Sequence, residues 1–173
     1  MEKELQAYRA AKKILLNYIG TFSDEQLNKA LSAESWSTIQ VCHHLLAVEE
    51  GLHNMLSAKK EKIDGYSSMK LKTKFNYLVL WVVFQFPSLK FKAPDFVANV
   101  PARGTLKDLQ ERWSVADSNL ESSIKSLTSA QLNKAIFTHP AVGRLNADYM
   151  LNFTTLHLQR HFQQVKRILT KVA

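Results

Sequence analysis

The sequence predicts an all-α protein, a four-helix bundle formed by a single domain over residues 1–173. Only five glycines and four prolines occur in 173 residues, so few residues interrupt regular structure. A serine or threonine followed three residues later by a side chain that can return a hydrogen bond occurs four times at predicted helix starts. Long amphipathic segments fill much of the remaining chain, and this length is sufficient for one core.

The expected helices follow these starts along the chain. The starting residues and their partners are Ser23 with Gln26, Ser37 with Gln40, Thr105 with Asp108, and Thr128 with Gln131. We predict long helices over about 3–19, 38–59, 105–127 and 146–171, and short helical turns after Ser23 and Thr128. A further helix is expected near 68–86. Three prolines make residues 87–104 a non-helical connection between the second and third long helices: Pro87, Pro94 and Pro101.

Composition limits the compartment and the relation to membranes. The single cysteine, Cys42, excludes an intramolecular disulfide, and the charged N-terminal segment does not resemble a secretion signal, so we expect a cytoplasmic protein. The most apolar run, FNYLVLWVVFQF at 75–86, is shorter than the roughly 20 residues that span a bilayer. We therefore expect no membrane span, and we expect this run to cover one side of the bundle or to form a subunit interface.

The positive charge is concentrated in one segment. The chain carries a formal net charge of +8, and residues 59–92 hold eight lysines against Glu61 and Asp64. A solvated lysine face is the commoner explanation of such a run, whereas an anionic ligand, a membrane surface or nucleic acid would also be attracted to it. Because no nucleic-acid reading motif accompanies the lysines, we expect no specific nucleic-acid binding.

Helical periodicity orients the histidines of the 38–59 helix. Its apolar residues fall within one stripe: Val41, Leu45, Val48, Leu52, Met55 and Leu56. His44 lies at the edge of this stripe, whereas His43 and His53 are expected to face solvent or the rim of a neighbouring helix. Cys42 lies about 160° around the helix from His44, so the two are not expected to bind the same ion.

His157 and His161 are four residues apart and leave the same face of the last helix. They fall within a predicted core stripe: Met150, Phe153, His157, His161, Gln164, Val165 and Ile168. Burying an unpaired polar group costs about 1–3 kcal/mol, so the pair predicts either a hydrogen-bond network or a metal site. With His44 as a third inward imidazole, the set suits zinc, nickel, iron or copper and leaves a coordination position for water or substrate.

Two segments carry a family resemblance. SWSTIQVCHHL at 35–45 resembles the helix start and inward His-Leu pair of DinB/YfiT-like proteins. FTHPAVGRLNADYMLNFTTLHLQRHFQQVKRI at 137–168 is similar to the last segment of that family, with an HP-x-x-G loop and an HxxxHxxQ motif. The resemblance implies an up-down-down-up four-helix bundle, frequently a homodimer, with a divalent metal at one end. Its metal ligands would be His44, His157 and His161.

The resemblance also implies classes of function. It favours a metal-dependent enzyme with a small-molecule substrate, either a thiol-dependent S-transferase using a low-molecular-weight thiol or a metal-dependent hydrolase. Anionic thiols would give the lysines of 59–92 a steering role. The alternative is a non-enzymatic binding or stress-response module with a structural or vestigial histidine cluster. No catalytic residue is assigned from the sequence, although Glu49 and Asp148 are weak candidates for a general base.

Overall fold

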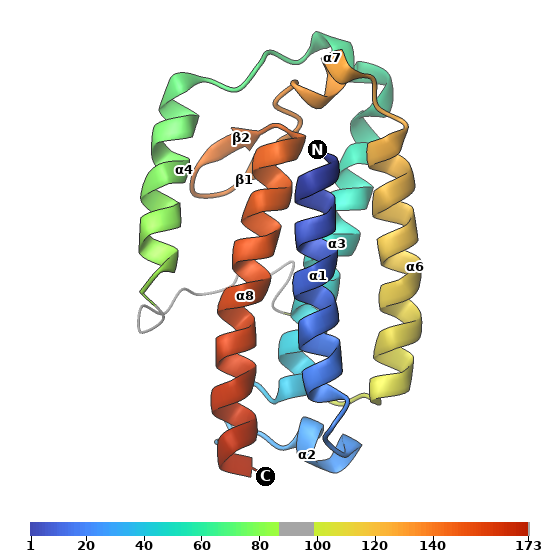
Figure 1. Ribbon diagram of the computed structural model, residues 1–173, viewed down its shortest axis with the longest axis vertical. Coiled ribbons are helices and arrows are strands. Elements are labelled where there is room, and N and C mark those ends of the chain that lie inside the picture. Colours follow the sequence, from blue (N-terminus) through green and yellow to red (C-terminus); the bar gives the residue numbers. More distant parts are fainter. Residues whose placement is uncertain (87–98, 173) are drawn as a thin grey trace.

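Four long helices dominate the computed structural model, which describes residues 1–86 and 99–172 (Figure 1). They are α1 (Glu2–Ile19), α3 (Thr38–Lys59), α6 (Leu106–Lys125) and α8 (Ala147–Val172). In Figure 1, α1 and α8 run in one direction and α3 and α6 run in the opposite direction. Helix α3 contacts α6 and α8, and α1 contacts α8. The predicted mostly helical fold is confirmed.

Shorter elements connect and cover the long helices. They are α2 (Asp24–Asn28), the 3-10 helix η1 (Lys60–Gly65), α4 (Leu71–Phe84), α7 (Ser129–Leu132), β1 (Phe137–His139) and β2 (Gly143–Leu145). The helix expected near 68–86 is α4, which contacts α8. Residues 87–98, including Pro87 and Pro94, lie outside the described residues. The backbone around Pro101 is non-helical, as predicted.

The helix starts have the predicted caps. Ser23, Ser37 and Thr128 each form a full capping box with a glutamine three residues later. Thr105 accepts a hydrogen bond from the backbone N–H of Asp108, but no returning bond is present. The aspartate side chain is one methylene shorter than a glutamate side chain. The Ser37 cap matters most for the site, because it begins the helix that carries His44.

A small hairpin was not anticipated among the predicted elements. Strands β1 and β2 pair antiparallel, with Phe137 opposite Leu145 and His139 opposite Gly143. Gly143 has φ of 99°, a backbone conformation that glycine adopts without strain, and this lets the chain reverse. Strands of three residues are too short to give a clear period-two pattern, so the sequence indicated only a loop.

An ionic network ties three helices together inside the core. The Nζ atom of Lys12 lies 3.0 Å from Oε1 of Glu49 and 2.7 Å from Oδ1 of Asp117. The Tyr8 hydroxyl and the Trp113 indole each donate to Oε2 of Glu49 at 2.6 Å. Burial raises the pKa of Glu49, and the charge of Lys12 opposes that rise. Glu49 therefore joins α1, α3 and α6, and this carboxylate is occupied by structural contacts.

No described helix is both long and apolar enough to cross a membrane. Helix α4 is nevertheless strongly apolar, and its large hydrophobic side chains are divided between two faces. Tyr77 and Leu80 pack against the core on one face, while Phe75 and Leu78 on the other are exposed. The prediction that this segment covers one side of the bundle is therefore confirmed for its inner face only.

Candidate metal centre

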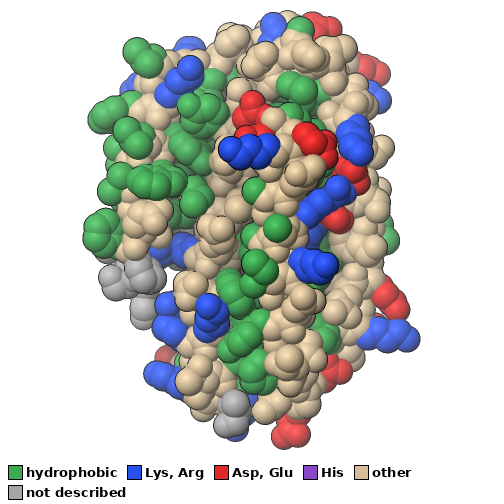
Figure 2. All heavy atoms as spheres, in the orientation of Figure 1, with side chains coloured by type: hydrophobic (Ala, Val, Ile, Leu, Met, Phe, Trp, Pro, Cys, Tyr) green, Lys and Arg blue, Asp and Glu red, His purple; other side chains and the backbone are tan. Residues whose placement is uncertain are grey.

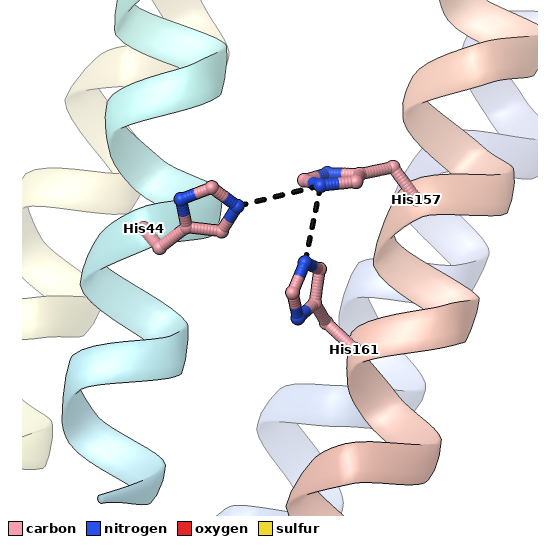
Figure 3. Close-up of side chains that lie close together, drawn as sticks. All are labelled: His44, His157 and His161. Atoms are coloured by element: carbon pink, nitrogen blue, oxygen red, sulfur yellow. Dashed lines mark hydrogen bonds between the residues drawn. The ribbon is translucent and has the colours of Figure 1, made fainter. Parts of the chain in front are cut away.

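Three histidines from two helices meet at one point. The Ser37 cap begins α3 and places His44 two turns into it, while His157 and His161 are one turn apart on α8. Nε2 of His157 lies 3.3 Å from Nε2 of His44 and 3.1 Å from Nε2 of His161 (Figure 3). One ligand atom from each ring lies within 4.8 Å of the other two. The structure thus brings together the three residues that the sequence singled out.

The spacing of these nitrogens suits one ion. A tetrahedral zinc ion with Zn–N bonds of 2.0–2.1 Å requires its nitrogen ligands to be about 3.3–3.4 Å apart. Two of the three Nε2 separations, 3.3 and 3.1 Å, are close to this value, and the ligand atoms of the third pair lie within 4.8 Å of each other. Hydrogen bonds among the three rings would satisfy their nitrogens less well than one ion, because a proton shared by two ring nitrogens does not serve the third. The donor set therefore fits a divalent ion that prefers imidazole.

The rings lie among aromatic side chains, and burial keeps those of His157 and His161 neutral. Trp36 lies 5.2 Å from the His44 ring, and Phe153 stacks on His157 at 5.5 Å between centroids. Burial, followed by the neighbouring histidines, lowers the pKa of His157 well below its ordinary value. Burial and the charge of His44 lower the pKa of His161 to about 4. Both rings are neutral at pH 7, which is the form that binds a metal.

Gln164 sets the tautomer of one ligand. Nδ1 of His161 lies 2.9 Å from Oε1 of Gln164. Because an amide oxygen only accepts, Nδ1 carries the proton and Nε2 keeps its lone pair for the shared point. Such a partner orients a metal-binding histidine and raises its basicity. By contrast, Nδ1 of His157 is buried and has no hydrogen-bond partner among the described residues.

The histidine pair lies beside the most buried stripe of α8, whereas we predicted it in the middle of that stripe. The fully buried residues near it are Met150, Leu151, Thr154, Leu158, Val165 and Leu169. His157, His161 and Gln164 are only partly buried. The stripe in contact with α1 and α3 is rotated away from the histidines, so helical periodicity alone placed them too deep. A partly exposed edge leaves the site open to a small ligand.

The prediction for His43 was wrong, because His43 is buried with 7% of its surface exposed. A Cβ atom on Gly104 would lie 2.8 Å from Nε2 of His43, so the backbone before α6 covers this ring. We had assumed that α3 is buried along one side, but it contacts α2, α6 and α8. His53 faces the rim of α6, as predicted, with Nδ1 2.8 Å from Oγ of Ser123.

The remaining named residues lie apart from the three histidines. Cys42 is buried, and burial raises the pKa of its thiol to about 12. Asp148 lies near the start of α8, 3.1 Å from the N-terminal amine. Among the described residues, neither of these nor Glu49 joins the group that could hold a metal.

Sequence reasoning missed His139, which lies on the hairpin beside α8. Its ring is 4.4 Å from Phe153, the residue that stacks on His157. Nδ1 of His139 accepts hydrogen bonds from the backbone N–H groups of Ala141 and Val142 at 3.2 and 3.3 Å. Burial lowers the pKa of His139 to about 4. The HP-x-x-G pattern was the available signal, since these bonds form within that turn.

Arg160 was also not singled out from the sequence. Its guanidinium lies 5.3 Å from the ring of Phe84 on α4 and donates a hydrogen bond to the carbonyl of Phe86 at 3.2 Å. Its charge contributes to the lowered pKa of both His157 and His161, which places a cation close to the three histidines. In the sequence Arg160 is only the neighbour of a histidine, and this does not indicate where its side chain lies.

Comparison with known proteins gives one family match and one curated relative of note. A family model described as the DinB superfamily matches residues 7–165. The chain is 26% identical over 170 residues to the uncharacterized protein YuaE of Bacillus subtilis (strain 168), a match that covers 97% of this chain and 98% of that protein. No solved structure matches significantly.

Proposed function

The chain belongs to the DinB superfamily, and on this premise we propose that it is a metal-dependent enzyme. His44, His157 and His161 would hold one divalent ion, with zinc, nickel or iron the best suited to three imidazoles. The convergence of their ligand atoms within 4.8 Å supports this proposal most directly. We also propose a single domain over 1–173 with up-down-down-up topology, supported by the helix directions in Figure 1.

The chemistry follows from the number of ligands. Three protein ligands leave a position for an exogenous group, and a bound divalent ion supplies Lewis acidity that lowers the pKa of a water or thiol there. The proposed reaction is therefore transfer of a low-molecular-weight thiol to a small-molecule substrate, or hydrolysis of such a substrate. The single cysteine is buried with a raised pKa, so the thiol in the first reaction would come from a cofactor.

The residues around the ligands have separate roles in this proposal. Gln164 holds the proton of His161 on Nδ1 and orients the ring. Trp36 and Phe153 cover two of the ligand rings and limit the access of bulk water. Arg160 supplies a positive charge beside the ligands, which would favour an anionic substrate or an anionic thiol. The lysines described between 59 and 74 would add a longer-range attraction for anions.

The experiment that tests this proposal combines metal content and activity. Protein purified without a histidine tag would be loaded with zinc, nickel or iron, and bound metal would be counted by elemental analysis. The loaded protein would then be assayed for thiol transfer and for ester or amide hydrolysis. We expect about one ion per chain and one of the two activities, with both lost in His157→Ala. Stoichiometric metal without either activity would favour a binding or stress-response module instead.

A further inference from the structure

The outer face of α4 is an exposed apolar surface. Figure 2 shows hydrophobic side chains gathered over this helix. The exposed fractions of the five main residues are 82% for Leu71, 66% for Phe75, 56% for Leu78, 47% for Val79 and 44% for Val82. A helix that is apolar on all sides is normally buried on all sides. We name this set of five residues the α4 outer face, and no described element covers it.

The inner face of the same helix is already occupied. Tyr77 packs edge-on against Tyr149 of α8 at 4.9 Å between centroids, and Phe84 lies 5.9 Å from Phe153. Because α8 holds α4 through these contacts, α4 cannot turn its outer face inward without losing them. Among residues 1–86 and 99–172, no other element covers these exposed side chains, so their face is available to a partner.

The spacing of the exposed residues identifies the shape of that partner. Leu71, Phe75, Leu78 and Val82 follow one another at intervals of four, three and four residues. This alternation is the pattern of a helix that packs lengthwise on a second helix. A helix of 14 residues offers a seam about 21 Å long. The partner surface is therefore expected to be another apolar helix.

The charges at the ends of α4 favour one relative orientation of two packed α4 helices. Lys70, Lys72 and Lys74 lie at the N-terminal end, where the dipole of their own helix disfavours cations. The helix contains no acidic residue, and its last turn contains no basic residue. If a second α4 helix packed antiparallel on this one, its C-terminal end would place partly negative carbonyls beside these lysines. A parallel α4 would bring six lysines together instead.

We propose that the α4 outer face binds a second copy of this chain, with the two α4 helices packed antiparallel. In this arrangement Leu71 lies opposite Val82 of the partner subunit, and Phe75 lies opposite Leu78 of the partner subunit. The two-fold axis passes between Phe75 and Leu78. An anionic membrane surface is disfavoured, because an interfacial helix carries its cations along a polar face, whereas here they gather at one end.

This interface lies next to the candidate metal centre but does not depend on it. The C-terminal end of α4 contacts Arg160 through the ring of Phe84 and the carbonyl of Phe86. Packing of a second copy on α4 would hold that end against α8. The proposal therefore stands whether or not the three histidines bind metal, and it is tested by association rather than by activity.

Sedimentation velocity on the tag-free chain tests association. We expect the wild type to be a dimer at high micromolar concentration, and Phe75→Glu to be a monomer with an unchanged circular dichroism spectrum. Val115→Glu is the matched control, because Val115 is 61% exposed on α6. This control should remain dimeric. A monomeric wild type, or a Phe75→Glu variant that stays fully dimeric, would overturn the proposal.

Cysteine cross-linking tests direction. Leu71→Cys and Val82→Cys would be made separately, with an affinity tag on one of them to distinguish the masses, and the native Cys42 is buried. Under mild oxidation we expect a mixed disulfide when the two variants are combined, and little cross-linking of either alone. Efficient cross-linking of Leu71→Cys to itself would contradict the antiparallel arrangement.

Vesicle binding addresses the alternative occupant. Wild-type protein would be mixed with vesicles of phosphatidylserine and phosphatidylcholine and sedimented, with Phe75→Glu and Val115→Glu alongside. We expect Phe75→Glu to cosediment with the vesicles to the same extent as wild type and Val115→Glu. A monomeric wild type that cosediments with these vesicles through Phe75 would overturn the second-copy proposal in favour of a membrane surface.

Discussion

Nδ1 of His161 lies 2.9 Å from Oε1 of Gln164, three residues further along α8. The contact leaves Nε2 of His161 directed at Nε2 of His157, 3.1 Å away. A glutamine beside the buried stripe of α8 is thus explained by the histidine that it orients. The HxxxHxxQ pattern therefore describes one unit, two candidate ligands and the residue that holds one of them.

Replacing Gln164 should weaken metal binding without removing a ligand. In Gln164→Leu the His161 ring loses its acceptor, so the metal affinity should fall by about 10- to 100-fold. Gln163→Leu is the matched control, since Gln163 is the exposed neighbour on the same helix. Competition against a chromophoric chelator measures both affinities. Equal affinities for the two variants would show that Gln164 does not support the site.

Removing Lys12 should destabilise the fold strongly. In Lys12→Met the fully buried carboxylate of Glu49 loses its cation, and breaking a buried pair in this way costs about 3–5 kcal/mol. The exposed neighbour provides a control, Lys13→Met, which should change stability by about 0.5 kcal/mol or less. Urea unfolding measures both. The double variant Lys12→Met with Glu49→Gln should lose less than the sum of its parts, and strict additivity would argue against a coupled pair.

A side chain at position 104 should be destabilising while His43 is present. A Cβ atom there would lie 2.8 Å from Nε2 of His43, so we expect Gly104→Ala to destabilise the protein by about 1–3 kcal/mol. In a His43→Ala background the same change should cost much less. Gly51→Ala serves as the control, because a Cβ at Gly51 meets nothing within 4 Å and alanine favours helix. An equal cost in both backgrounds would contradict the contact.

Acid should destabilise the metal-free protein through His161. The pKa of its ring is about 4 in the folded state and about 6.5 in the unfolded state, so the unfolded chain binds more protons between these values. The contribution of His161 to the free energy of unfolding is therefore fully present above pH 6.5. It falls as the pH drops towards 4, by roughly 3 kcal/mol. Urea unfolding in the presence of a chelator should show a shallower loss for His161→Gln. Identical pH profiles would refute this assignment.

The helices and the three central histidines could be predicted from the sequence because each depends on local periodicity. Hydroxyl caps act within four residues, and the spacing of His157 and His161 is a property of one helix. The burial of His43 could not be predicted in this way, because it depends on contact with Gly104, which is far away in the sequence.

Long-range pairing also hid the role of Glu49. An isolated glutamate on α3 resembles a candidate base, and its partners Tyr8, Lys12 and Trp113 lie on two other helices. The hairpin was missed for a related reason, since three-residue strands form only when a partner strand and a turn at Gly143 are present. Tertiary contacts thus decided each of the features that periodicity did not indicate.

The measurement that tests the central proposal most directly is metal-dependent thermal stability of tag-free protein at pH 7. Wild type, His161→Ala and the control His53→Gln would each be melted with a hundredfold excess of zinc over its dissociation constant and again with chelator. For wild type and the control we predict stabilisation by zinc of about 2.7 kcal/mol at that excess, and for His161→Ala almost none. Wild-type protein that binds no zinc, nickel or iron and melts identically with and without chelator would contradict a metal centre at His44, His157 and His161.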